Sequence, residues 1–220
     1  MIVTIDGPAG SGKSTAARRL ARALGVAYLD SGATYRAATL KALREGVDLG
    51  DAAALAEIAA RMDLKLTPAR EALRVELDGR DVTDAIRSPE VTDNAHHIAS
   101  VPQVRRVLVA LQRRIAAGLG DVVTEGRDQG SAVFPEADVK FYLDAAADVR
   151  ARRRCEELAA RGRHVDYDQV LEAIRRRDHR DQTRAADPLV MPDGAIVVDT
   201  SGNTIAQTTA ELRRHVEALR

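Results

Sequence analysis

The chain has 220 residues, 45% of them hydrophobic and 30% charged, which is enough to form one domain with a sizeable core. Lys+Arg and Asp+Glu both number 33, so bulk charge does not support a general electrostatic attraction to nucleic acid or to an anionic membrane. The single cysteine, Cys155, excludes an intrachain disulfide and a cysteine-rich zinc site. We find no signal peptide and no apolar run near the roughly 18 residues of a membrane helix, and therefore expect a cytoplasmic protein.

Strands and helices alternate in the first part of the chain. The β-branched run Ile2–Ile5 predicts a buried strand, and the apolar spacing over Lys13–Leu24 predicts a helix that ends at Gly25. The elements expected next are a strand and two helices, over Val26–Leu29, Tyr35–Glu45 and Asp51–Arg61. Asp51 is the expected N-cap of the second of these helices.

The pattern then changes to a short β-rich segment. Leu64–Leu66 and Leu73–Leu77 alternate apolar and polar residues, with Pro68 between them and an Asp78-Gly79 turn signal after the second. We interpret this antiparallel patch as an insert in an otherwise α/β chain.

The remainder returns to alternating elements. Ser88 and Pro89 mark a helix start, and this helix is expected to continue, with a break near Pro102, to about Ala117. The elements expected after it are strands over Val122–Thr124, Val139–Leu143 and Ile196–Val198, and helices over Arg150–Arg161, Tyr167–Arg184 and Ile205–Leu219. Such alternation predicts a parallel sheet covered by helices on both faces.

The strongest motif is Gly7-Pro8-Ala9-Gly10-Ser11-Gly12-Lys13-Ser14-Thr15, which fits G-x-x-x-x-G-K-[ST] between a predicted strand and a predicted helix. Glycines let backbone N–H groups approach phosphate oxygens, and the start of the helix adds partial positive charge. Lys13 is expected to reach the β- and γ-phosphates, and the Ser14 hydroxyl to ligate Mg²⁺. The motif predicts ATP or GTP binding and leaves the phosphoryl acceptor open.

Three clusters contain arginines that could meet a second phosphate. They are Asp30–Arg36, Glu125–Asp128 and Arg177–Arg184. The first two follow predicted strands, and ligands of open parallel sheets bind beyond the carboxyl ends of the strands. We therefore expect Arg36 and Arg127 to point into the crevice that holds the ATP phosphates, where planar guanidinium groups suit a phosphomonoester dianion.

These clusters, in this order with the phosphate loop, resemble the bacterial cytidylate (CMP) kinases, which belong to the nucleoside monophosphate kinases among the P-loop kinases. The resemblance rests on Asp30-Ser31-Gly32-x-x-Tyr35-Arg36, Gly126-Arg127-Asp128 and Asp181-x-x-Arg184-x-x-x-Pro188-Leu189. It covers nearly the whole chain as a single kinase domain, with residues 62–100 as the monophosphate-binding insert and residues 150–165 as a helical lid over ATP. It implies ATP-dependent phosphorylation of CMP or dCMP in pyrimidine nucleotide metabolism.

The resemblance also implies roles for single residues. On the cytosine they are Ser31, Arg105, Asp128 and Arg184; on the CMP phosphate, Arg36 and Arg127; on the ribose, Arg177 and Asp181; on ATP, the phosphate loop and Arg154. Lys13, Arg36 and Arg127 form the expected catalytic set. The chain departs from the family at Glu125, where the family often has Asp, and at His96, where it often has a small polar residue near the ribose.

The cytosine ring agrees with this assignment, because its N4 donates while N3 and O2 accept, which matches one carboxylate and two guanidinium groups. The mechanism we expect is direct in-line transfer without a covalent enzyme intermediate, by positioning and charge neutralisation. We expect a monomer with small-molecule substrates. Two alternatives stay open: a P-loop kinase for another monophosphate or for a metabolite such as shikimate or gluconate, and a nucleic-acid-associated P-loop regulator. The aromatic content of 3% argues against single-strand binding.

Overall fold

The computed structural model describes residues 1–68, 73–160 and 162–219. The chain forms two compact units: residues 1–26 with 123–220, and residues 27–122. The expected insert, 62–100, falls inside the second unit, and the expected lid, 150–165, falls inside the first. Their roles stay predictions, and residue 161 lies outside the described residues.

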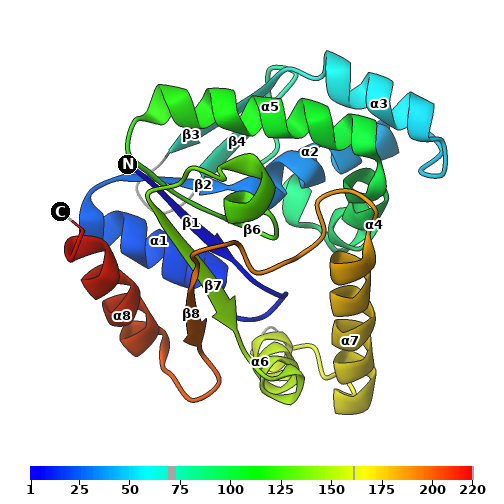
Figure 1. The fold of residues 1–220 in the computed structure, drawn as a ribbon. Coiled ribbons are helices and arrows are strands. Elements are labelled where there is room, and N and C mark those ends of the chain that lie inside the picture. The colour runs from blue at the N-terminus through cyan, green and yellow to red at the C-terminus, as the bar shows by residue number, and fades with distance from the viewer. Residues whose placement is uncertain (69–72, 161, 220) are drawn as a thin grey trace. The chain divides into compact units, whose positions relative to one another are not determined.

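The first unit is built on parallel strands (Figure 1). The parallel sheet has five strands, and the four of the first unit follow the order β6-β1-β7-β8. Their bounds are β1 Ile2–Asp6, β6 Val122–Gly126, β7 Val139–Asp144 and β8 Ile196–Asp199. The fifth strand, β2 (Ala27–Asp30), opens the second unit. Ile5 and Phe141 are partners in the β1–β7 register and are both fully buried, as expected for a parallel sheet covered by helices.

Helices cover the strands of the first unit. They are α1 (Lys13–Leu24), α6 (Ala147–Ala159), α7 (Tyr167–Thr183) and α8 (Ile205–Glu217), and a short π-helical segment, η2, spans Gln129–Val133. Helix α1 packs against α8, and α6 against α7 (Figure 1). Gly25 ends α1 in the left-handed conformation (φ 69°), which confirms the predicted C-terminal signal.

The second unit combines helices with a small antiparallel sheet. The helices are α2 (Ser31–Arg44), α3 (Ala52–Arg61), α4 (Pro89–Ser100) and α5 (Pro102–Leu119), with a 3₁₀ turn, η1, over Ala85–Arg87. The strands are β3 (Leu64–Pro68), β4 (Leu73–Leu77) and β5 (Arg80–Asp81), in that order. Helix α2 packs against α4 and η1, and α3 packs against α5.

Local signals placed most element ends correctly. The Asp51 carboxylate accepts hydrogen bonds from the N–H groups of Ala53 and Ala54, both at 3.0 Å, which confirms the predicted cap of α3. The Ser88 hydroxyl caps α4 by accepting a bond from the N–H of Val91 at 3.3 Å. The break near Pro102 is confirmed between α4 and α5.

Two expectations in the second unit differ from the structure, and one short strand has no signal in the sequence. Helix α2 begins at Ser31 and not at Tyr35, because the Asp30 carboxylate caps it through the N–H of Ala33 at 3.1 Å. Pro68 does not stand between the strands: it is the last residue of β3, paired with Leu73, and residues 69–72 lie outside the described residues. Strand β5 has no signal in the sequence, because two residues are too few to show the alternation of apolar and polar side chains that marks a strand.

Among the described residues, no helix is both long and apolar enough to cross a membrane.

Candidate active site

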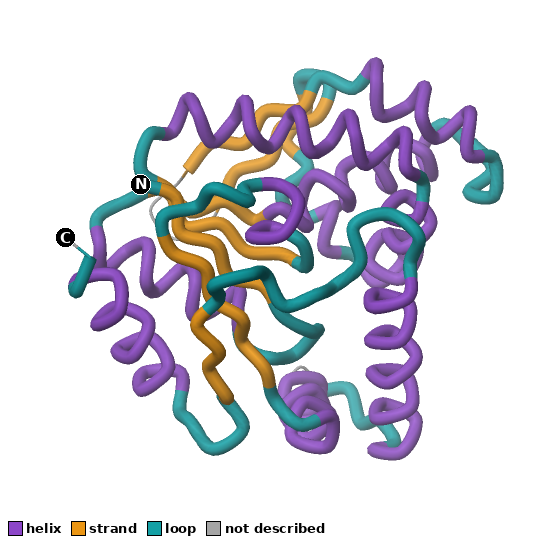
Figure 2. The backbone as a smooth tube through the Cα atoms, viewed as in Figure 1, coloured by secondary structure: helices purple, strands orange, loops and turns teal. Residues whose placement is uncertain are grey.

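The loop between β1 and α1 has the backbone that the phosphate motif predicts. Gly10 and Gly12 take left-handed φ angles of 80° and 85°, which L side chains rarely adopt. Gly12 is the N-cap residue and has no side chain to cap the first turn of α1. The start of α1 can therefore receive an anionic ligand on its N–H groups. Figure 2 draws the segment between β1 and α1 as a loop.

Gly7 is fixed by close backbone contact. Its φ is +148°, and a Cβ placed on it would lie 2.0 Å from the carbonyl oxygen of Leu143 at the neighbouring strand β7. The loop therefore starts against the sheet with no room for a side chain.

Lys13 is a buried cation within the first unit. The residue is 5% exposed, and its Nζ donates a 2.9 Å hydrogen bond to the carbonyl oxygen of Pro8, so the side chain folds back over its own loop. Burial, followed by the charge of Arg127, lowers the pKa of Lys13 to about 7, although Glu125 and Asp181 oppose the shift. Oxygens of a bound polyphosphate would supply the negative charge needed to stabilise the ammonium form of Lys13.

Ser14 meets a carboxylate at the end of β6. Its hydroxyl donates a 2.8 Å hydrogen bond to Oε1 of Glu125, which is 5% exposed. The hydroxyl and the buried carboxylate together offer hard oxygen ligands. Mg²⁺ prefers ligands of this type. The residues present therefore fit the magnesium ion that the phosphate motif implies. Glu125 is one of the two positions where the sequence departs from its apparent family, and its side chain still reaches Ser14.

Arg127 follows β6 and is held by Asp181 of α7. Its Nε donates a 2.7 Å hydrogen bond to Oδ2 of Asp181, and the two side chains are only 17% and 19% exposed. Burial works against charge on both groups, but their attraction outweighs it, so the pKa of Arg127 is raised and that of Asp181 is lowered. Arg177 also lies close enough to lower the pKa of Asp181. The structure thus brings together Lys13, Arg127, Arg177 and Asp181.

Asp128 and Arg184, both expected on the cytosine, also meet in the first unit. Oδ2 of Asp128 lies 3.7 Å from Nη2 of Arg184, and Asp128 is 2% exposed. Nε of Arg184 donates a 2.7 Å bond to the carbonyl oxygen of Asp187. The N–H of Leu189 donates a 2.7 Å bond to the carbonyl oxygen of Asp181. This bond holds the segment that follows α7 against the last turn of the helix. An acceptor and a guanidinium donor are therefore placed side by side, as a cytosine edge requires.

Ser31 and Arg36 lie in the second unit, near the start of α2. Nη2 of Arg36 donates a 2.7 Å hydrogen bond to Oδ2 of Asp30, the residue that also caps α2. Gly32 has no Cβ, and one placed there would lie 2.8 Å from Nη1 of Arg36. Ser31 is buried as the first residue of α2. Arg36 and Arg127 belong to different units, so the expectation that they share one crevice stays a prediction.

Arg105 is buried on α5 and points toward α2. It is 1% exposed, and its guanidinium carbon lies 5.4 Å from the centre of the Tyr35 ring, within the range of a cation–π interaction. Its Nη1 also donates a 3.4 Å bond to the carbonyl oxygen of Ala99. The aromatic ring and the carbonyl together fix this guanidinium.

Arg150 is a contact of the phosphate loop that the sequence analysis did not assign. It is 5% exposed, forms a two-point ion pair with Asp178 of α7 at 3.1 and 2.7 Å, and donates a 3.0 Å bond to the carbonyl oxygen of Ala9. Its place on the first turns of α6, directly after β7, is the signal that could have singled it out. Arg154, the predicted ATP contact on the same helix, is half-exposed and pairs with Glu157 at 3.2 Å, so its role stays a prediction.

Asp6 is a second buried contact that the sequence analysis missed. It ends β1, is fully buried, and accepts hydrogen bonds from the N–H groups of Gln129 at 2.8 Å and Gly130 at 2.7 Å. Burial raises the pKa of Asp6 to about 7. Asp6 thereby ties the start of the phosphate loop to the segment that follows Arg127 and Asp128.

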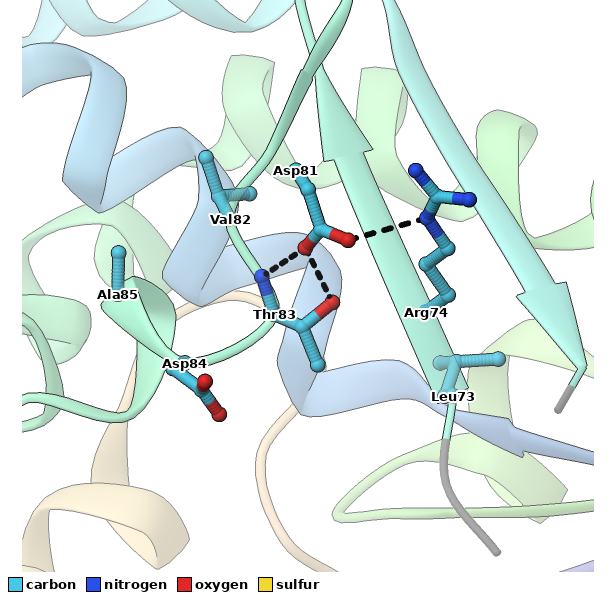
Figure 3. Close-up of a pocket in the computed structure, with 7 residues that line it drawn as sticks. All are labelled: Leu73, Arg74, Asp81, Val82, Thr83, Asp84 and Ala85. Carbon is cyan, nitrogen blue, oxygen red and sulfur yellow. Dashed lines mark hydrogen bonds and ion pairs between the residues drawn. The ribbon is translucent and has the colours of Figure 1, made fainter. Parts of the chain in front are cut away.

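A hollow in the second unit, shown in Figure 3, is lined by residues of β4, β5 and the turn after them. Its polar groups bond to one another: Arg74 pairs with Asp81 at 3.0 Å, and the Thr83 hydroxyl donates a 2.7 Å bond to the same carboxylate. Internal pairing accounts for these groups, and we assign them no ligand.

Comparison with known proteins identifies relatives over nearly the full chain. A family model described as cytidylate kinase matches residues 3–218. The cytidylate kinase of Pelotomaculum thermopropionicum is 50% identical over 217 residues, covering 98% of this chain and 96% of the relative. That of Caldanaerobacter subterraneus subsp. tengcongensis is 45% identical over 218 residues, covering 99% and 94%.

Among solved structures, an uncharacterized protein from Eubacterium ventriosum matches with a TM-score of 0.50 at 13% identity, with 99% of each chain covered. A likeness at that identity bears on the fold alone. It agrees with the parallel sheet flanked by helices, and the expected fold class is confirmed.

We predict that Gly7→Ala destabilises the protein by at least about 2 kcal/mol, because the new methyl group meets a backbone oxygen that cannot rotate away. Gly25→Ala is the matched control: its φ is also positive, but nothing lies within 4 Å of the added Cβ, so left-handed strain of roughly 1 kcal/mol is expected. Urea unfolding measures both. Equal losses would show that the Leu143 contact is unimportant.

We predict that ATP binding at pH 8 takes up a proton. Lys13, with a pKa of about 7, is mostly neutral there, and the phosphates raise its pKa when they arrive. Below pH 6 the lysine is already charged, and its share of the uptake disappears. Calorimetry in buffers of different ionisation enthalpy measures the proton count, and Lys13→Arg, which is permanently charged, should abolish the uptake at pH 8. The same uptake in wild type and variant would contradict this assignment.

Proposed function

Because the chain belongs to the cytidylate kinase family, we propose that it transfers the γ-phosphoryl group of ATP to CMP or dCMP, giving CDP or dCDP and ADP. One observation of the structure supports the proposal independently of family membership. The buried Lys13 and Arg127 of the phosphate-binding region share the first unit with the Asp128–Arg184 pair, which offers the acceptor and donor that cytosine requires.

On the donor side, ATP binds to the loop Gly7–Thr15. The N–H groups at the start of α1 and the Lys13 ammonium contact the β- and γ-phosphates. Ser14 and Glu125 would hold Mg²⁺, and the chemistry that the ion would supply there is neutralisation of phosphate charge. Arg150 keeps the loop in place through the carbonyl of Ala9. Residues 150–165 act as the lid, with Arg154 on ATP.

On the acceptor side, each residue has one proposed role. Arg36 and Arg127 bind the CMP phosphate and, with Lys13, neutralise charge during transfer. Arg177 and Asp181 bind the ribose. The residues proposed on the cytosine are Ser31, Arg105, Asp128 and Arg184. The carboxylate of Asp128 accepts from N4 of cytosine but would oppose O4 of uracil, which is the physical basis for base preference.

The transfer itself requires little covalent chemistry from the protein. A phosphate oxygen of CMP attacks the γ-phosphorus of ATP in line with the departing ADP oxygen, so one P–O bond forms as another breaks. The attacking oxygen is already anionic, and no strong general base is required. The protein contributes by aligning the two phosphates and by reducing their repulsion with fixed cations. The monomeric state and cytoplasmic location stay predictions, the first of which sedimentation analysis can test.

A panel of acceptors tests the proposed function directly. With Mg²⁺ and ATP, ADP release should be fast with CMP and dCMP and much slower with AMP, dTMP, shikimate or gluconate. Lys13→Ala should lower kcat/KM for CMP by roughly 100-fold or more while the circular dichroism spectrum is retained. Strong turnover of another acceptor without turnover of CMP would overturn the proposal, and near-normal activity of Lys13→Ala would remove the loop from the mechanism.

Base preference provides a second, narrower prediction. Asp128→Ala should lower kcat/KM for CMP by roughly 10- to 100-fold, because a charge-assisted hydrogen bond is lost, and should affect UMP much less. Asp128→Asn keeps the shape of the side chain and should show the same change in the CMP to UMP ratio. The exposed Asp193, changed to Ala, is the control for loss of a carboxylate. Equal losses for both nucleotides would make Asp128 a structural residue.

A further inference from the structure

One carboxylate of the second unit lies close to two guanidinium groups. Oδ2 of Asp30 is 2.7 Å from Nη2 of Arg36 and 4.0 Å from a terminal nitrogen of Arg87, Nη2. The Asp30 side chain is only 8% exposed, whereas Arg36 is 21% and Arg87 47% exposed. Two fixed positive charges therefore face a single negative one, and the cluster carries a net charge of about +1.

Arg36 has a donor that this arrangement does not use. Its Nε is buried, and no group in the described part of the chain accepts a hydrogen bond from it. Nε and Nη2 lie on one edge of the guanidinium, and Asp30 engages Nη2 alone. A buried donor without an acceptor is unfavourable, so this edge is suited to an anion with two oxygens in the guanidinium plane.

The main chain fixes the position of Arg87, but the side chain of Arg87 contributes little to the stability of the fold. It ends the η1 turn, where its N–H donates a 2.9 Å bond to the carbonyl oxygen of Asp84, and the capped helix α4 begins directly after Ser88. Its 4.0 Å separation from Asp30 is longer than a hydrogen bond, and an ion pair at that distance from a half-exposed arginine contributes little to stability. The main chain thus holds this arginine beside Arg36, while its guanidinium donors remain able to contact a ligand.

We propose that Arg87 is a further phosphate-binding residue for the monophosphate substrate, acting with Arg36. This inference rests on the proposed function. A phosphomonoester brings a charge of −1.5 to −2, more than one carboxylate can offer, and several oxygens in place of one. It draws Nη2 of Arg36 away from Asp30, accepts a hydrogen bond from the unused Nε of Arg36, and accepts another from Arg87. Asp30 then keeps its other role, as the cap of α2.

The test separates the phosphate of CMP from its nucleoside. Arg87→Ala should raise KM for CMP by roughly 10- to 100-fold, because one charge-assisted hydrogen bond to phosphate is lost. It should leave KM for ATP unchanged. The inhibition constant of cytidine, which has no phosphate, should stay within twofold of wild type. Arg80→Ala removes an exposed arginine of the same unit and should leave all three constants unchanged.

An unchanged KM for CMP in Arg87→Ala would overturn the inference. A weakening of cytidine equal to that of CMP would also overturn it, because Arg87 would then act on the fold of the site. Arg87→Lys keeps the charge but not the planar fork and should recover part of the loss. CMP turnover by the wild-type chain tests the proposed function, whereas the ratio of variant to wild type tests Arg87 alone, so the two failures are distinguishable.

Discussion

The buried positive charge of Lys13 and Arg127 is the constraint on which the rest of this site depends. Lys13 is 5% exposed, and burial together with Arg127 lowers its pKa to about 7. Two cations in a poorly solvated region are costly unless negative charge lies nearby. Glu125 and Asp181 supply that charge within the fold. Both carboxylates contact residues that we assign to substrates, so the groups that keep the site folded are also those that nucleotide phosphates and Mg²⁺ would engage.

The same arrangement recurs in the second unit at smaller scale. Asp30 caps α2 and holds Arg36, as Asp181 holds Arg127 in the first unit. In both cases a carboxylate fixes a guanidinium at a short distance while leaving other donors on the guanidinium plane. This explains how a chain with zero formal net charge can bind two polyanions: Asp30 and Asp181 each hold one arginine in place, and a more highly charged anion can replace the carboxylate as the partner of that arginine.

Local chemistry accounts for what could be predicted from the sequence. The placement of the Gly7–Thr15 motif between a strand and a helix, the cap by Asp51 and the end of α1 at Gly25 each depend on a few adjacent residues, and all three are confirmed. The contacts that could not be predicted join distant residues. Arg150 reaches Ala9 and Asp6 reaches Gln129 only because β1, β6 and β7 lie in one sheet. The sequence near residues 150–154 offers four arginines, and only tertiary packing distinguishes the buried Arg150 from the exposed Arg154.

We propose that phosphate replaces carboxylate as the partner of the site's arginines. A crystal structure with CMP and a non-hydrolysable ATP analogue tests it most directly. We expect Arg36 and Arg127 both to contact the CMP phosphate, with Nε of Arg36 now hydrogen-bonded and the bond from Arg127 to Asp181 lengthened or lost. If both arginines stay paired as in the free protein, with the CMP phosphate bound elsewhere or facing solvent, then the carboxylates are their permanent partners and the exchange does not occur.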